Sequence, residues 1–205
     1  MKFLKLTLVF FLITLQGFAH FATTNPNKSV DILILVDNSA SMAAYQKAFS
    51  EKVEKALAPF AYSSLNIGLI TTDAAINPVF VGSKINGTFS EVMAQLKKEI
   101  RSVGTNGSAS EAHMSQILKT FKQNSRFNFH RSNTELQVFI VTDEDEQDMT
   151  AKEFVTEAVK FKTFDKLFVN VYSPKCRPAG NFEWRDSQLY FLSSITGGTQ
   201  NDLCP

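Results

Sequence analysis

Continuous apolar runs recur along the chain, and each is typical of a strand that is buried on both faces of a sheet. VDILILV (30–36) is the first, and it consists mostly of β-branched residues and leucine. Such runs lack the alternation of a half-exposed strand. PVFVG (78–82) is shorter and begins with Pro78, which predicts an antiparallel strand at an edge. The predicted strands are 30–36, 65–73, 78–82, 135–143, 167–173 and 197–204.

Segments with helical periodicity separate most of these strands. In FSEVMAQLKKEIRSV (89–103) the apolar residues fall on one face, and Ser90 is the predicted cap. Pro59 is predicted to end the first helix. The predicted helices are 41–60, 89–103, 111–123, 150–162 and 187–196.

The alternation of strands and helices predicts one α/β domain. We expect a three-layer, Rossmann-like, doubly wound sheet that is mostly parallel, with one short antiparallel edge strand. Binding sites in such sheets lie beyond the carboxyl ends of the strands, so the residues that follow the strands are the first candidates for function.

The first residues of the chain have the pattern of an export signal. Lys2 and Lys5 precede the apolar run LTLVFFLITL, and GFA supplies small residues before a predicted cut after Ala19. A membrane span needs roughly 18 or more apolar residues, and this run is shorter, although an uncleaved tether stays open. We therefore predict a secreted or periplasmic protein. The predicted parts are a signal peptide at 1–19, a flexible lead at 20–28 and a single domain at 29–205.

Charge and cysteine content narrow the function classes. The chain has 21 basic and 20 acidic residues, and removing the two lysines of the signal leaves 19 basic residues against 20 acidic ones. This balance gives no electrostatic reason to expect nucleic acid or an anionic membrane as a partner, and no membrane span is expected after cleavage. In an exported chain the two cysteines, Cys176 and Cys204, predict a disulfide, with two unpaired buried thiols as the alternative.

Oxygen-bearing side chains follow two of the buried strands. The first strand is followed by DNSAS, in which Asp37, Ser39 and Ser41 alternate, and Asp143 follows the strand ELQVFIVT. Between them, GTNGSAS offers Thr105, with Ser108 and Ser110 behind it. An all-oxygen set of this kind suits a hard divalent cation such as Mg²⁺, Mn²⁺ or Ca²⁺. An ordinary strand-to-helix turn with a serine cap is the simpler interpretation of DNSAS alone.

The order strand–DxSxS–helix, Thr-bearing loop, strand–TD resembles the von Willebrand factor type A domain with its metal-ion-dependent adhesion site, over about residues 29–204. GTNGSASE, IVTDEDEQD and ITGGTQNDLC resemble a bacterial, exported branch of that family. The resemblance implies hydroxyl ligands and carboxylates that bind directly or through water. Ala40 stands where the family usually has Gly, and the longer Thr loop leaves Ser108 as an alternative to Thr105. The implied ligands are Asp37, Ser39, Ser41, Thr105 and Asp143.

The resemblance implies a binding module in which Mg²⁺ accepts an acidic side chain from a protein partner, rather than an enzyme. Two alternatives stay open. One is a structural or scaffold domain whose metal site is inactive. The other is a metal-dependent hydrolase with Glu144 or Asp145 as a base, although Ser39 replaces the second Asp of the phosphatase pattern Asp-x-Asp. The acidic run DEDEQD (143–148) is either a solvated loop or a second calcium site.

Overall fold

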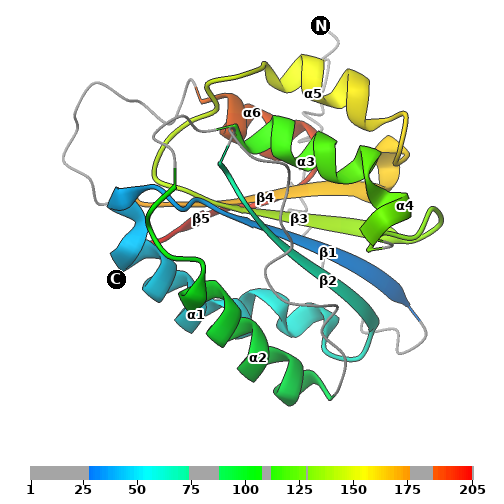
Figure 1. Cartoon of the computed structure of the whole chain (residues 1–205). Coiled ribbons are helices and arrows are strands. Elements are labelled where there is room, and N and C mark those ends of the chain that lie inside the picture. Colours follow the sequence, from blue (N-terminus) through cyan, green and yellow to red (C-terminus); the bar gives the residue numbers. More distant parts are fainter. Residues whose placement is uncertain (1–27, 74–87, 108–111, 128, 176–186, 205) are drawn as a thin grey trace, which may run out of the picture.

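A computed structural model describes residues 28–73, 88–107, 112–127, 129–175 and 187–204. The fold is α/β, with a central sheet between two layers of helices (Figure 1). Its strands run parallel in the order β2-β1-β3-β4-β5, so β1 lies inside the sheet. The strands are β1 (Ser29–Val36), β2 (Ser64–Thr71), β3 (Glu135–Val141), β4 (Leu167–Ser173) and β5 (Gln200–Asp202).

Helices cover both faces of this sheet. α1 and α2 lie side by side on one face, and α3, α5 and α6 lie on the other (Figure 1). The short α4 and three single 3-10 turns complete the described elements. The helices are α1 (Ala43–Leu57), α2 (Phe89–Ser102), α3 (His113–Lys122), α4 (Asn124–Phe127), α5 (Ala151–Ala158) and α6 (Gln188–Ile195).

Strand β1 shows why a continuous apolar run belongs in the middle of this fold. Ile32 and Ile34 pack into the core under α1 and α2. Leu33 and Leu35, which alternate with them, pack into the second core under α3, α5 and α6. Both sets are buried because successive side chains of a strand point to opposite faces. Apolar residues are therefore favoured at successive positions from Ile32 to Val36.

The predicted fold class is confirmed, and several boundaries are corrected. The first helix ends before Pro59, which lies in a following 3-10 turn. Thr88, not Ser90, caps α2, because its hydroxyl accepts the Glu91 N–H while the Glu91 carboxylate accepts the Thr88 N–H. α5 ends at Ala158, four residues short of the predicted end. The predicted edge strand 78–82 lies outside the described residues.

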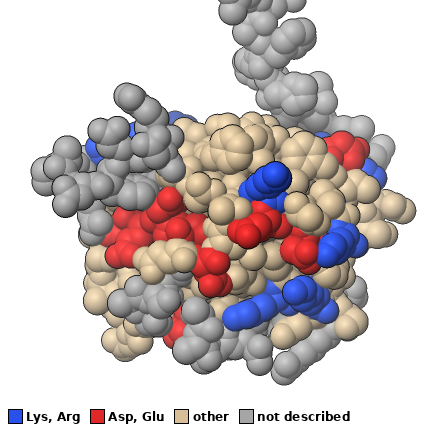
Figure 2. Space-filling view, turned by 90° about the horizontal axis from the view of Figure 1, so that it is seen from above, with Lys and Arg blue, Asp and Glu red and all other residues tan. Residues whose placement is uncertain are grey.

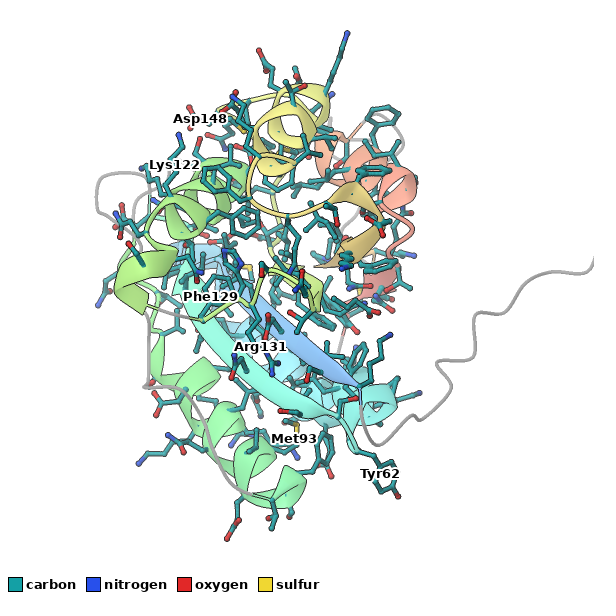
Figure 3. All side chains as sticks on the ribbon, turned by 90° about the vertical axis from the view of Figure 1, so that its right-hand side faces the viewer. Tyr62, Met93, Lys122, Phe129, Arg131 and Asp148 are labelled. Atoms are coloured by element: carbon teal, nitrogen blue, oxygen red, sulfur yellow. The ribbon has the colours of Figure 1, made fainter. Side chains whose placement is uncertain are left out.

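A network of charges occupies the amino edge of the sheet, away from the carboxyl ends of the strands. Asp31 lies in β1 with no exposed surface. Its carboxylate accepts hydrogen bonds from the backbone and side chain of Arg131 and from the Thr134 hydroxyl. The Lys162 ammonium donates to the Arg131 carbonyl. Figure 3 looks onto this edge and shows Arg131 beside the amino end of β1. These contacts tie the segment before β3 to β1.

His130 adds a pH-dependent contribution to stability. Its ring lies 5.0 Å from the ring of Phe129 and 5.4 Å from that of Phe121. Burial, aided by the nearby Lys162 charge and opposed by Asp31, lowers the pKa of His130 from 6.5 to about 4. The unfolded chain therefore binds this proton at a higher pH than the folded chain does. Stability should be lost as the pH falls from 6.5 towards 4.

We expect the free energy of unfolding to fall more steeply over this pH range in the natural protein than in a His130→Leu variant. Urea unfolding at half-unit pH steps measures the difference. Leucine fills a similar volume and cannot titrate, so the comparison isolates the imidazole. Parallel pH profiles for the two proteins would contradict this assignment.

The carboxyl-terminal strand is held to α1 by a lysine. The Lys52 ammonium donates to the carbonyl oxygens of Asp202 and Cys204, at 3.1 and 2.7 Å. The described part of the chain contains no free cysteine. Cys176 lies outside the described residues, so the Cys176–Cys204 bridge stays a prediction. The predicted signal peptide also lies outside them, and none of the described helices has the length and apolar character of a membrane span.

Candidate metal centre

The pairing of β1 with β3 places the two predicted carboxylates at one edge of the sheet. Val36 is opposite Val141 in the parallel register, and the ladder continues when the Asp37 N–H donates to the Val141 carbonyl at 2.9 Å. Asp37 and Asp143 thus follow neighbouring strands at their carboxyl ends. Both residues are buried. The edge is at the left of Figure 1, where β1 leads into α1.

Contacts between side-chain oxygens connect the serines that follow β1 to Asp143, which follows β3. The hydroxyl oxygens of Ser39 and Ser41 lie 3.2 Å apart, and the Ser41 hydroxyl donates to Asp143 Oδ1 at 3.1 Å. Ser39 and Asp143 are buried and Ser41 between them is exposed, so the oxygens reach the surface at Ser41. The alternation of DNSAS therefore places the hydroxyls of Ser39 and Ser41 beside each other.

Asp37 is the most enclosed member of this group. Its carboxylate has no exposed surface and accepts the Ser39 N–H at 2.7 Å and the Thr142 hydroxyl at 2.8 Å. Both donors are neutral, and no lysine or arginine among the described residues pairs with Asp37. A buried charge without a counter-charge is costly, and a bound cation would offset that cost. The site has the chemistry of a cation site.

Thr142 was not among the predicted site residues, although it contacts Asp37 directly. Its hydroxyl also accepts the Glu144 N–H at 3.0 Å, which folds the start of the acidic loop back on the strand end. The sequence held a weak signal for this role, because Thr142 directly precedes Asp143 at the end of a buried strand. We assign Thr142 the role of holding the Asp37 carboxylate in one orientation.

The loop that follows α2 is attached to the DNSAS turn. The Gln46 side-chain amide donates to the carbonyls of Asp37 and Gly104, both at 2.8 Å. The Gly107 N–H donates to the Asn38 carbonyl, also at 2.8 Å. Gly104 has a φ of +76°, which an L-residue rarely adopts, and it turns the chain at the end of α2. These bonds hold Thr105 between two points that contact the turn.

Gly107 lies against the side chain of Asn38, which a larger residue at position 107 would have to displace. A β-carbon at that position would lie 2.4 Å from side-chain atoms of Asn38. Thr105 itself is half-buried, between Gly104 and Gly107. Ser108 and Ser110 lie outside the described residues. The choice between Thr105 and Ser108 as a hydroxyl ligand therefore stays open.

The acidic run after β3 has a structural role that the sequence pattern did not indicate. Asp145 accepts the Ser187 hydroxyl at 2.6 Å and the N–H groups of Gln188 and Leu189 at 2.9 and 3.1 Å, at the first turn of α6. Glu146 accepts the Met114 N–H at 2.7 Å, at the first turn of α3. The run thus caps two helices.

Other acidic side chains remain on the surface nearby. Figure 2 looks down on the α3 and α5 side of the molecule, where acidic side chains form a band with lysine and arginine side chains on both sides of its right-hand part. Asp148, Glu153 and Glu157 belong to this side and line an open hollow along α5. The described residues contain no group of three or more His, Cys, Asp and Glu side chains that is placed to hold a metal ion.

Removing the cap on α6 should destabilise the protein. We expect Asp145→Ala to lower the free energy of unfolding by about 1–2 kcal/mol, because Gln188 and Leu189 would lose the acceptor for their N–H groups. Urea unfolding measures the change. Glu51→Ala, which removes an exposed acid in α1, is the matched control and should change stability by less than about 0.5 kcal/mol. Equal effects of the two substitutions would refute the capping role.

Comparison with known proteins supports the fold and leaves the function to be argued from the site. No protein-family model matches the chain, and no curated protein sequence matches it. Among solved structures, two of proximal thread matrix protein 1 from the mussel byssus are similar, with 12% and 11% sequence identity and a TM-score of 0.61 in each case. A third structure of that protein has a zinc-occupied MIDAS motif, with 13% identity and a TM-score of 0.58.

These similarities cover 86% of the chain but only 45%, 44% and 45% of the three mussel chains. The chain therefore spans less than half the length of those chains. At such low identity the likeness shows the fold alone, a parallel sheet between two layers of helices.

Proposed function

We propose that this chain is an exported binding protein that engages a protein partner through a divalent cation. Asp37, Ser39, Ser41, Thr105 and Asp143 would hold the cation. The observation that carries the proposal is the buried Asp37 carboxylate, which has only neutral donors around it among the described residues and lies beside the two serines. The mussel protein with a zinc-occupied MIDAS motif shows that a metal can be held in a protein of this fold.

The donor set favours Mg²⁺ or Mn²⁺ over a softer ion. All of the proposed side-chain ligands are oxygens, and hard cations prefer oxygen. A bound cation would have a coordination position that an acidic side chain of the partner can occupy. Ser41 is exposed while Asp37 is fully buried, so the open side of the site faces the solvent at Ser41. The chain's own residues thus hold the cation and leave its outer side accessible.

We propose binding rather than catalysis. The two acidic residues named as a possible base in the hydrolase alternative have other contacts: Asp145 caps α6, and Glu144 accepts a hydrogen bond from Gln147 at 3.0 Å. Export to the medium or the periplasm is proposed from the signal-like first residues, and a bacterial source from the segments that resemble that branch. A structural domain with an inactive site is the second candidate, since the similar mussel proteins are thread matrix proteins.

A capture experiment tests the proposal. The mature protein, immobilised with Mg²⁺, should retain a protein from the native medium or envelope, release it on addition of EDTA and retain it again when Mg²⁺ is restored. An Asp37→Asn bait is the matched control and should retain nothing in an EDTA-sensitive manner. If the bait binds no divalent cation in calorimetric titration, the scaffold alternative replaces the proposal.

A further inference from the structure

An open pocket lies between α1 and α2, next to the candidate metal centre. It has a volume of 290 Å³ and is lined by Ala43, Gln46, Lys47 and Arg101. The two helices lie side by side, and the start of α1 and the end of α2 meet at the carboxyl edge of the sheet (Figure 1). The pocket therefore lies at the same end of the molecule as the candidate metal centre.

Gln46 connects the pocket directly to the metal centre. Only 4% of this residue is exposed, and its amide nitrogen holds the Asp37 carbonyl and the Gly104 carbonyl. The same side chain thus lines the pocket, supports the strand end that carries Asp37 and supports the loop that carries Thr105. Ala43, which also lines the pocket, follows Ser41 by two residues. The residues that line this pocket and the proposed metal ligands thus belong in part to the same short stretch of chain, from Ser41 to Lys47.

Two cations without acidic partners line the pocket. Lys47 and Arg101 are exposed, and neither forms a salt bridge with any described residue. The Arg101 Nε donates to the Ser50 hydroxyl at 2.9 Å, and that hydroxyl donates to the Lys47 carbonyl at 2.7 Å. These bonds fix the Arg101 side chain at its Nε and leave the outer nitrogens of the guanidinium for a ligand. The pocket therefore has the charge and the donors to bind a carboxylate.

We propose that the partner presents two acidic side chains to this protein. One would reach the metal, and the second would bind between Lys47 and Arg101. This inference rests on the proposed function and adds a recognition rule to it. The metal selects an acid, and the pocket selects partners in which a second acid stands nearby in the same segment. If Lys47 and Arg101 served only to keep the protein soluble, partners with a second acid would not be preferred.

Synthetic peptides provide the test. Eight-residue peptides in a Gly/Ser background would carry one glutamate, or two glutamates separated by zero to four residues, and fluorescence anisotropy would measure their binding to the Mg²⁺-loaded protein. We expect the best two-acid peptide to bind about fivefold more tightly than the one-acid peptide at low salt. The gain should shrink at about 0.5 M NaCl, because ion pairs at exposed sites are screened.

Variants separate the pocket from the metal centre. Lys47→Gln combined with Arg101→Gln should remove the gain from the second acid while leaving Mg²⁺ affinity and one-acid binding unchanged. Lys55→Gln combined with Lys98→Gln removes two exposed cations from the same helices and should preserve the gain. Glutamine keeps the helix propensity high in both pairs, and a melting curve confirms that each variant is folded.

The outcomes distinguish the two proposals. Failure of Mg²⁺ to bind would overturn the proposed function, and this inference with it. Mg²⁺-dependent binding of the one-acid peptide, with no gain from a second acid at any spacing, would overturn the pocket inference alone. The pocket inference would also be overturned if the control pair lost the gain as fully as the Lys47 and Arg101 pair, since the effect would then be one of net charge.

Discussion

Replacing Asp31 by asparagine should lower the free energy of unfolding by about 3 kcal/mol, which is among the largest effects expected of any single substitution in this chain. Removing one partner of a buried ion pair typically costs about 3–5 kcal/mol, because the remaining charge is left without compensation. Asp31 is fully buried, and Arg131, with 35% of its side chain exposed, lies 2.8 Å from it. Water can hydrate part of the Arg131 charge, which favours the lower end of the range.

Guanidinium chloride unfolding measures this effect against a matched pair on the surface. Glu54→Gln breaks the exposed pair with Lys97 and should cost less than about 1 kcal/mol. Asp31 lies at the opposite edge of the sheet from Asp37, so Asp31→Asn should bind Mg²⁺ as the natural protein does. If the two substitutions cost the same, the amino-edge network is not a major source of stability.

The fold could be predicted because its main signal is local. Each buried strand carries an unbroken apolar run, and the strand-end rule then directed attention to Asp37 and Asp143. The sequence places Asp31 inside such a run, but it does not indicate which basic residue pairs with Asp31. Arg131 lies 100 residues away in the sequence, and a partner at that distance leaves no periodicity or spacing to read.

The acidic loop shows a second kind of limit. Asp145 binds backbone N–H groups more than 40 residues away, at the start of α6. The residues of that helix start resemble an ordinary capped turn, since Ser187 also caps it by accepting the Tyr190 N–H. Sequence alone therefore favoured solvent or calcium as the partner of the acids. Lys162 is a further example, because its ammonium donates to the Arg131 carbonyl, 31 residues away in the sequence.

Mg²⁺ should stabilise the natural protein and should have almost no effect on an Asp37→Asn variant. At a Mg²⁺ concentration about 100 times the dissociation constant, the natural protein should gain about 2.7 kcal/mol in its free energy of unfolding. The variant removes the buried charge that attracts the cation. Asparagine keeps an oxygen that can accept the Ser39 N–H, so the metal-free variant should remain close to the natural protein in stability.

The hydrogen bonds of Asp37 explain why asparagine is a sharper test than alanine. Asp37→Ala would leave the Ser39 N–H and the Thr142 hydroxyl without their acceptor, which costs about 1–3 kcal/mol for each buried group. That loss would occur with or without metal, and it would obscure the effect on binding. Ser39→Ala deletes a neutral ligand instead, so it should weaken Mg²⁺ binding less than Asp37→Asn does.

Calorimetric titration with Mg²⁺ and Mn²⁺, paired with thermal melts, compares the natural protein with Asp37→Asn, Ser39→Ala and Asp31→Asn. The last variant is less stable but keeps the candidate site, so it separates loss of metal from loss of stability. We expect affinity to fall in the order natural protein and Asp31→Asn, then Ser39→Ala, then Asp37→Asn. Because the Asp37 charge is buried among neutral donors, undiminished binding by Asp37→Asn would mean that the cation site lies elsewhere.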